Sequence, residues 1–141
     1  MTWFVWALLS AFFAGITAIL AKVGVENVDS SLATAIRTSV ILVLVWAVAF
    51  AATPAGALTL PGRKTMLFLA LSGIATGLSW LCYFRALQLG EASRVAPIDK
   101  LSVVFVIVLA GVFLRERITW QNAVGGALIV AGSIVIAWRA R

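Results

Sequence analysis

Four ionisable side chains lie within stretches of the chain that are otherwise apolar. They are Arg37, Arg85, Asp99 and Lys100. A charge in hydrocarbon is costly, so ionisable residues in such stretches are candidates for a solute pathway, a gate or a proton relay. Imidazole catalysis is excluded, because the 141 residues include no histidine. The chemistry that these residues indicate is the binding or gating of a charged solute.

Metal and thiol chemistry have little support in the sequence. Cys82 is the single cysteine, so it cannot form an internal disulfide or supply the several ligands of a zinc site. We interpret it as a small buried residue. We therefore predict no metal site, no cofactor and no enzymatic activity.

A stripe of hydroxyl groups runs along residues 66–89. Ser72, Thr76, Ser79 and Tyr83 recur at helical spacing and therefore share one face. Such a stripe suits a wet solute pathway, in which Trp80 and Tyr83 could stack on a substrate. The alternative is that the hydroxyl groups bond to the backbone of the preceding turn, as is common in membrane helices.

Small residues mark two further helix faces. Beside the hydroxyl stripe, Gly73 and Gly77 form a Gly-x-x-x-Gly pair on a face that also holds Trp80 and Phe84. Gly125 and Gly132 share a face of the last apolar stretch. Because glycines allow helices to approach closely in membranes, we predict packing or dimer contacts at all four.

The composition of the chain indicates that membrane helices position the residues named above. Apolar residues make up 63% of the chain and charged residues only 11%, whereas soluble domains are about one quarter charged. A chain this short cannot cover that much apolar surface in an aqueous core. We therefore predict an all-α integral membrane protein. Despite a net charge of +6, we expect no nucleic-acid partner, because most basic residues flank apolar stretches, where they anchor membrane helices.

Five apolar stretches approach the roughly 20 residues that a helix needs to cross the hydrocarbon core. They are residues 3–21, 32–52, 66–89, 95–114 and 122–138, which leave no soluble segment and predict one membrane domain over residues 1–141. The first lacks a basic leader and is too long for a signal peptide, so we expect it to be retained. Ser31, Ser93 and Thr119 are the expected N-caps of the second, fourth and fifth helices.

The four embedded charges fall at similar depths. Arg37 and Asp99 each lie six residues beyond the expected caps, about 9 Å along their helices, and Lys100 is slightly deeper. Arg85 precedes the expected helix end by five residues, about 7 Å. All four belong to the same side of the membrane, so they can occupy one layer.

Asp99 is the embedded charge that most needs a partner. Arg37, Arg85 and Lys100 could instead extend to the membrane surface along their aliphatic stems, but the side chain of Asp99 is too short. Neighbouring residues on a helix point about 100° apart, which makes Lys100 a poor partner. We predict an ion pair between Asp99 and Arg85 or Arg37, which leaves positive charge for a carboxylate or for gating.

The basic residues of the connections give no clear orientation in the membrane. Five spans place the termini on opposite sides, and the Lys and Arg content of short loops sets which side is cytoplasmic. The two sides hold equal numbers, Arg63, Lys64, Arg115 and Arg117 against Lys22, Arg94, Arg139 and Arg141. This balance favours copies that insert both ways and pair antiparallel. The alternative is that the first span or a partner subunit decides the orientation.

The second half of the chain carries a family resemblance. From Tyr83 it reads Tyr-Phe-Arg-Ala-Leu-Gln-Leu-Gly-Glu-Ala-Ser-Arg-Val-Ala-Pro, and it continues through Leu-Arg-Glu-Arg-Ile-Thr at 114–119 to Gly125-Gly126. Over residues 67–138 this resembles the EamA family of the drug/metabolite transporter superfamily. The resemblance implies a five-helix unit of a secondary transporter. Many members carry two such units, so this chain would be one half of a ten-helix inverted-repeat transporter.

The resemblance and the embedded charges together predict transport. We expect an exporter of a small organic metabolite or drug that works by alternating access as a homodimer, multi-pass in a bacterial plasma (inner) membrane. Asp99 or Glu91 could couple transport to protons. The alternatives are a non-transporting membrane scaffold subunit and a dual-topology channel, and liposome flux would distinguish them.

Overall fold

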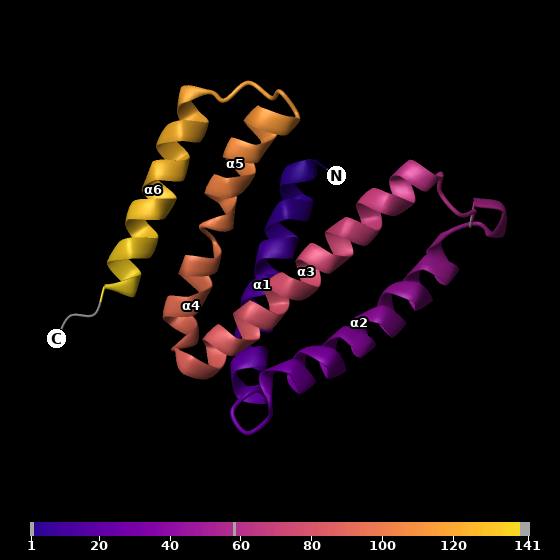
Figure 1. Cartoon of the computed structure of the whole chain (residues 1–141), viewed down its shortest axis with the longest axis horizontal. Helices are drawn as coiled ribbons and strands as arrows, with labels where there is room; N and C mark the ends of the chain where they lie inside the picture. Colours follow the sequence, from indigo (N-terminus) through magenta and orange to yellow (C-terminus); the bar gives the residue numbers. More distant parts are fainter. Residues whose placement is uncertain (1, 58, 139–141) are drawn as a thin grey trace. The chain divides into compact units, whose positions relative to one another are not determined.

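The computed structural model describes residues 2–57 and 59–138, and these are helical without strands (Figure 1). The elements are α1 (Trp3–Gly24), α2 (Ser30–Ala52), the short 3-10 helix η1 (Ala55–Ala57), α3 (Arg63–Leu89), α4 (Ala92–Asp99), α5 (Ser102–Phe113) and α6 (Trp120–Ala137). Because α4 and α5 together form one apolar segment, the described residues contain five helical segments able to cross a membrane. The prediction of an all-α protein with five spans is confirmed. Arg139 and Arg141 of the charge count lie outside the described residues.

The start of α2 differs from the prediction. Its N-cap is Asp29 and not Ser31, and the Asp29 Oδ1 accepts hydrogen bonds from the amides of Ser31 and Leu32 at 2.9 and 3.2 Å. A carboxylate accepts helix amides strongly and also suits the positive end of the helix dipole. The amides of Leu32 and Ser31 hold the pKa of Asp29 below its usual value, because they stabilise the charged form.

Of the other two predicted N-caps, the one at Ser93 is wrong and the one at Thr119 is confirmed. Glu91 precedes α4 in place of Ser93, which lies in the first turn of that helix. Thr119 caps α6 as predicted, and its hydroxyl oxygen accepts the amide of Asn122 at 3.3 Å.

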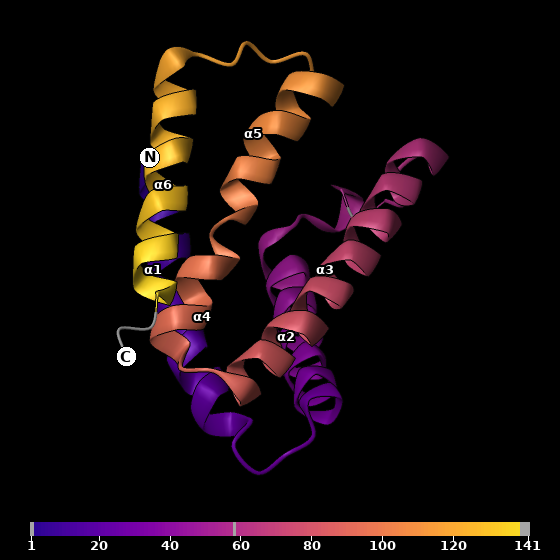
Figure 2. The same cartoon turned by 60° about the vertical axis from the view of Figure 1, so that its left-hand side comes forward.

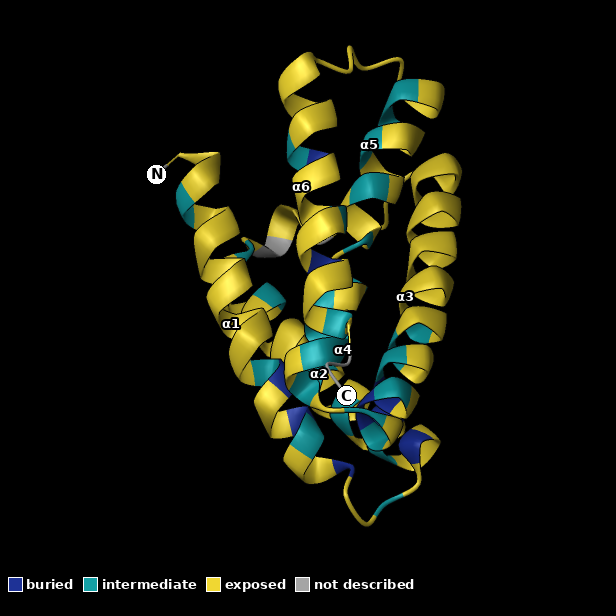
Figure 3. Cartoon of the chain, turned by 90° about the vertical axis from the view of Figure 1, so that its left-hand side faces the viewer, coloured by how far each residue is buried: buried dark blue, intermediate teal, exposed yellow. Residues whose placement is uncertain are grey.

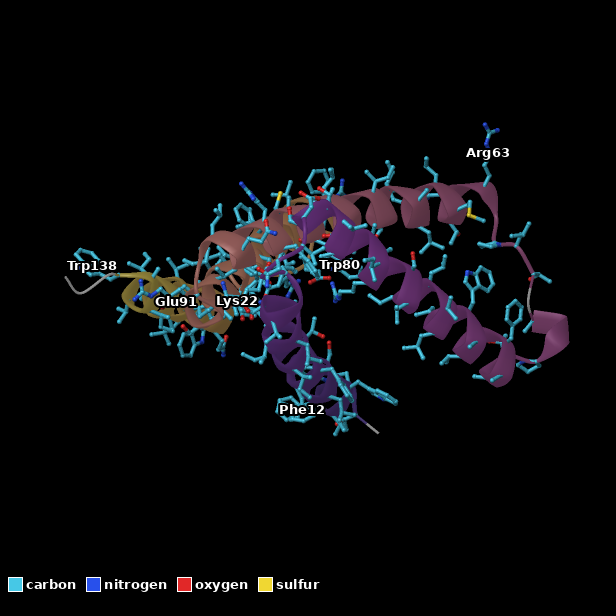
Figure 4. All side chains as sticks on the ribbon, turned by 90° about the horizontal axis from the view of Figure 1, so that it is seen from below. Phe12, Lys22, Arg63, Trp80, Glu91 and Trp138 are labelled. Carbon is cyan, nitrogen blue, oxygen red and sulfur yellow. The ribbon has the colours of Figure 1, made fainter. Side chains whose placement is uncertain are left out.

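The chain divides into two compact units. One is Ala21–Gln88, with the last turn of α1, all of α2 and all of α3 except Leu89. Here α2 and α3 lie close together near Trp80 and diverge toward Arg63 (Figure 4). The other combines Met1–Leu20 with Leu89–Arg141. In that unit, α4 and α5 follow one another along α6 (Figure 2).

Little of the apolar surface is covered within the chain (Figure 3). Among the described apolar residues, the buried side chains are those of Ala18, Ala21, Val25, Phe84 and Leu87. The long helices keep their backbone polar groups paired internally, so their exposed apolar side chains can face lipid. The molecule is a multi-pass membrane protein, and the lipid bilayer is its solvent.

Candidate functional site

Arg37 of α2 lies against two aromatic rings of α3. Its guanidinium carbon is 4.3 Å from the centre of the Trp80 ring and 5.5 Å from that of Phe84. Phe84 is buried, whereas Arg37 and Trp80 are half-buried. A cation within about 6 Å of an aromatic face is attracted by the ring's quadrupole. The structure therefore joins the predicted site residues Arg37 and Trp80 in one group.

The aromatic contacts stabilise Arg37 within a span, but they do not neutralise its charge. The residue lies seven positions beyond the start of α2, about 10 Å along its axis. An arginine at the centre of a membrane helix costs about 2.5–3.5 kcal/mol, whereas a cation–π contact contributes about 0.5–2 kcal/mol. Within the described part of Ala21–Gln88, neither Glu26 nor Asp29 forms an ion pair with Arg37. The guanidinium is therefore an electrostatically unbalanced group in this unit.

Arg85 belongs to a different cluster, at the end of α3. Its Nη1 donates a hydrogen bond to Oε1 of Gln88 at 3.0 Å. Nε2 of Gln88 in turn donates to the carbonyl oxygens of Val28 at 2.6 Å and Val25 at 3.3 Å. The pair thus ties the connection between α1 and α2 to the last turn of α3.

Lys22 reinforces this attachment from α1. Its Nζ donates to the carbonyl oxygen of Leu87 at 2.6 Å. Carbonyl groups in the last turn of a helix lack intrahelical donors, and a cation placed there also suits the negative end of the dipole. We call Lys22, Arg85 and Gln88 the α3 clasp. Gln88 was not identified from the sequence, and Lys22 was identified only as a basic residue of a connection, although both are polar residues at the end of an apolar stretch.

The Gln88→Leu substitution should destabilise the α3 clasp. It removes the donor to two backbone carbonyl groups and the acceptor of Arg85. A polar group that loses its partner in a covered position costs about 1–3 kcal/mol. We expect a fall of about 2 kcal/mol in the free energy of unfolding in detergent micelles. Gln121→Leu on the exposed start of α6 is the matched control, and an equal loss there would contradict the role of Gln88.

Asp99 and Lys100 lie where α4 ends. The Nζ of Lys100 is 3.4 Å from Oδ2 of Asp99, and the two side chains are 58% and 38% exposed, respectively. The expectation that adjacent residues make a poor pair is wrong here, because Lys100 lies in a turn outside the regular helix. Asp99 belongs to one unit and the two embedded arginines to the other, so an ion pair between them stays a prediction. Glu91 pairs with Arg94 at 3.1 Å.

The fourth span is interrupted beside this pair. In a continuous α-helix the carbonyl of Pro97 would accept the amide of Leu101. Instead it accepts the hydroxyl of Ser133 on α6 at 2.9 Å and the amide of Lys100 at 3.1 Å. The Leu101 amide donates to the carbonyl of Ile98 at 3.0 Å. Ser133, which the sequence analysis did not single out, thus helps to hold the interruption open.

A groove accompanies the interruption. It has a volume of about 430 Å³ and is lined by Pro97, Lys100, Gly132 and Ser133, together with apolar side chains of α4 and α6. The predicted residues Lys100 and Gly132 therefore meet in one place, within one unit.

The Ser133→Ala substitution tests this arrangement. Loss of the hydroxyl removes one of the two donors to the Pro97 carbonyl, and a single hydrogen bond contributes about 0.5–1.5 kcal/mol to stability. We expect a loss of about 1 kcal/mol in unfolding free energy, together with slower hydrogen exchange of the Leu101 amide as it gains the Pro97 carbonyl. Ser10→Ala, on the exposed face of α1, should change neither the unfolding free energy nor the hydrogen exchange of the Leu101 amide. Unchanged exchange at Leu101 would show that Ser133 does not hold the interruption.

The hydroxyl stripe of α3 remains on one helix face. Thr76 donates to the carbonyl of Ser72 at 2.9 Å, which is the backbone-bonded alternative. Ser72, Thr76 and Ser79 are exposed, and Tyr83 is half-buried. A pathway along the stripe stays a prediction.

Hydroxyl groups on α2 were not identified from the sequence. Thr34 and Thr38 flank Arg37, and each donates to the carbonyl of the residue four positions earlier at 2.7 Å. The spacing of Ser30, Thr34 and Thr38, four positions apart, already indicates a row of hydroxyl groups on one face of the helix. These bonds satisfy the hydroxyl groups locally, so they do not neutralise Arg37.

The four predicted glycines face open space among the described residues of their own units. A Cβ atom at Gly73, Gly77, Gly125 or Gly132 would meet nothing within 4 Å. Gly126 is instead the packed glycine of α6, because a Cβ there would lie 3.5 Å from Ile107 of α5. Contacts between copies at the four predicted glycines stay a prediction.

The structure places the single cysteine and shows which acidic or thiol side chains lie near one another. Cys82 is exposed on α3, so the expectation that it is buried is wrong for the single chain. Among the described residues, no group of three or more Asp, Glu, Cys or His side chains could hold a metal ion.

Two of the relatives described here carry transport names. The chain is 53% identical over 140 residues to an uncharacterized transporter in cobO 3′ region from Sinorhizobium sp, with 96% of each chain covered. It is 38% identical over 95 residues to a probable terminal-alkyne amino-acid exporter of Streptantibioticus cattleyicolor, which covers 64% of this chain and 31% of the exporter. An uncharacterized protein of Methanocaldococcus jannaschii is 27% identical over 74 residues, or 52% of this chain and 54% of that protein.

No solved structure matches the chain. The EamA-like transporter family matches residues 1–138, which confirms the resemblance found in the sequence. The five segments able to cross a membrane and the names of the Sinorhizobium and Streptantibioticus relatives agree with that match. The chain therefore belongs to the EamA-like transporter family.

Proposed function

We propose that the chain is a secondary transporter that exports a small organic solute by alternating access. The observation that carries this proposal is the family match, which extends over residues 1–138 and includes all five membrane segments. An exporter among the relatives supports the direction of transport. The Sinorhizobium relative supports the plasma membrane of a bacterium as its location.

A homodimer is the proposed working unit. Because 64% of this chain aligns with 31% of the Streptantibioticus exporter, that exporter is about twice as long. Two copies of this chain would supply the same length and ten membrane segments. The large exposed apolar surface of one copy and the balance of basic residues between its two ends support antiparallel pairing, which places a solute site at the interface of inverted repeats.

The proposed solute contacts begin at Arg37. Arg37 and Trp80 bind the solute, and the face of α3 with Thr76, Ser79 and Tyr83 extends the pathway. Asp99 and Lys100, at the interruption of the fourth span, serve gating, because interrupted helices are the parts that transporters use at their solute sites. Arg85 positions the end of α3 through the α3 clasp.

Flux into liposomes tests the proposed function. The full chain is reconstituted, and uptake of a panel of radiolabelled amino acids is followed, a choice that the amino-acid exporter among the relatives suggests. A transporter gives uptake that saturates with concentration and shows exchange against unlabelled solute inside. Uptake that rises linearly with concentration would indicate a channel. Uptake equal to that of protein-free liposomes would support a scaffold subunit.

A further inference from the structure

We propose that the guanidinium of Arg37 binds the carboxylate of a singly charged, amphipathic organic acid. This inference rests on the proposed function and names the class of solute at its site. The residues that carry it are Arg37 on α2 and Trp80 and Phe84 on α3, which lie together within the unit Ala21–Gln88.

The geometry of the stack leaves the hydrogen-bond donors of Arg37 available. A guanidinium is planar, with its N–H groups directed outward in its own plane. The guanidinium carbon lies over the Trp80 ring, 4.3 Å from its centre, and this contact with a ring face uses no oxygen acceptor. The fork of N–H groups at the rim of the guanidinium matches the two oxygens of a carboxylate, which it can bind through two parallel hydrogen bonds. The rings also limit the motion of the guanidinium, so less freedom is lost when a ligand binds.

The charged residues of this unit favour an anionic ligand at Arg37 and limit that ligand to a single negative charge. Asp29 is engaged by two amides of α2, and neither it nor Glu26 pairs with Arg37 in the described part of the unit. Arg85 differs, because Gln88 accepts its hydrogen bond. Within the unit Ala21–Gln88, the Arg37 group therefore holds one positive charge, which one carboxylate neutralises. A doubly charged phosphate ester would require a second cation at the same place.

The aromatic rings favour an amphipathic acid over a small inorganic anion. Trp80 is half-buried and Phe84 is buried, so these two rings give the guanidinium an apolar flank. A solute with an apolar group next to its carboxylate would cover this surface while its charge is neutralised. Chloride or acetate would gain only the electrostatic part of that interaction.

Binding to the purified full chain in detergent tests the site directly. The probes are phenylacetate, its neutral analogue phenylacetamide and the cation phenethylammonium. Equilibrium dialysis should show phenylacetate binding at least about tenfold more tightly than phenylacetamide, and phenethylammonium more weakly than either. Arg37→Gln should abolish the preference for the carboxylate. Arg37→Lys keeps the positive charge but lacks the paired N–H donors of the guanidinium, so it should retain part of the preference for the carboxylate.

Matched controls separate the site from general effects. Arg63→Gln removes one positive charge from the same unit at the other end of α3, and Trp46→Leu removes a tryptophan that stacks on Phe50 at 5.3 Å. Neither should change phenylacetate affinity, whereas Trp80→Leu should weaken it about threefold to tenfold. If Arg37→Gln does not fold, the comparison of phenylacetate with phenylacetamide in the unchanged protein, together with Arg37→Lys, decides the question.

The results that overturn the site differ from those that overturn transport. The site is wrong if the unchanged protein binds phenylacetate no better than phenylacetamide, or if Arg37→Gln keeps the preference. Saturable amino-acid uptake that Arg37→Gln leaves unchanged would likewise overturn the site while transport stands. Binding of phenylacetate that depends on Arg37, without saturable uptake of any probe, would overturn transport while the site stands.

Discussion

Replacing Leu87 by alanine is expected to lower the free energy of unfolding by about 3 kcal/mol, the middle of the range for buried leucines. Leu87 is fully buried, with 0% of its surface exposed, although most apolar residues of the chain are exposed. Its loss leaves a cavity under the end of α3, where Val25 also packs at 1% exposure. The carbonyl of Leu87 receives the Lys22 hydrogen bond, so a shift of this turn would also weaken the α3 clasp.

Leu89→Ala provides a close control for this prediction. Leu89 lies two positions further along α3 and is 75% exposed, so the same atoms are removed without creating a cavity. Its substitution should change stability by about 0.5 kcal/mol or less. Both variants are measured by denaturant unfolding in the same detergent. Equal effects would show that the buried end of α3 does not anchor the unit Ala21–Gln88.

The number and type of membrane segments could be predicted because length and composition determine them. A run of about 20 apolar residues has few alternatives to a spanning helix. Length and composition do not determine the helix starts in the same way, because Asp29 and Ser31 both offer oxygen acceptors within two positions. The stronger carboxylate acceptor at Asp29 forms the cap, and the difference was not visible from spacing alone.

Contacts between distant segments could be predicted only in part. The proximity of Arg37 to Trp80 depends on the register between α2 and α3, and the sequence identified both residues without joining them. At the interruption of the fourth span, the Pro97 carbonyl accepts the hydroxyl of Ser133, which lies 36 positions further along the chain. The local sequence around Pro97 does not indicate that a hydroxyl on another helix will bind this carbonyl group. The α3 clasp was missed for the same reason, since Gln88 acts on carbonyls 60 and 63 positions earlier.

Shifting the balance of basic residues should separate the two orientations of the chain. Arg63→Gln with Lys64→Gln leaves two basic residues on the N-terminal side against four on the other, and Arg139→Gln with Arg141→Gln leaves four against two. Because Lys and Arg residues favour the cytoplasmic side, the two variants should insert in opposite orientations. Reporters fused to the C-terminus, one active in the cytoplasm and one outside it, measure the outcome. For the unchanged chain both reporters should be active.

The same variants test the antiparallel dimer by complementation. If two charges bias insertion by roughly ten to one, the minority orientation limits pairing, and each variant alone should lose about fivefold in saturable flux. Producing both variants in one cell supplies the two orientations again and should restore the flux, whereas two tagged copies of one variant should not. Full flux from either variant alone would show that copies with one orientation suffice. The solute site would then lie within one chain or between parallel copies, and the basic residues of the connections would have no part in assembly.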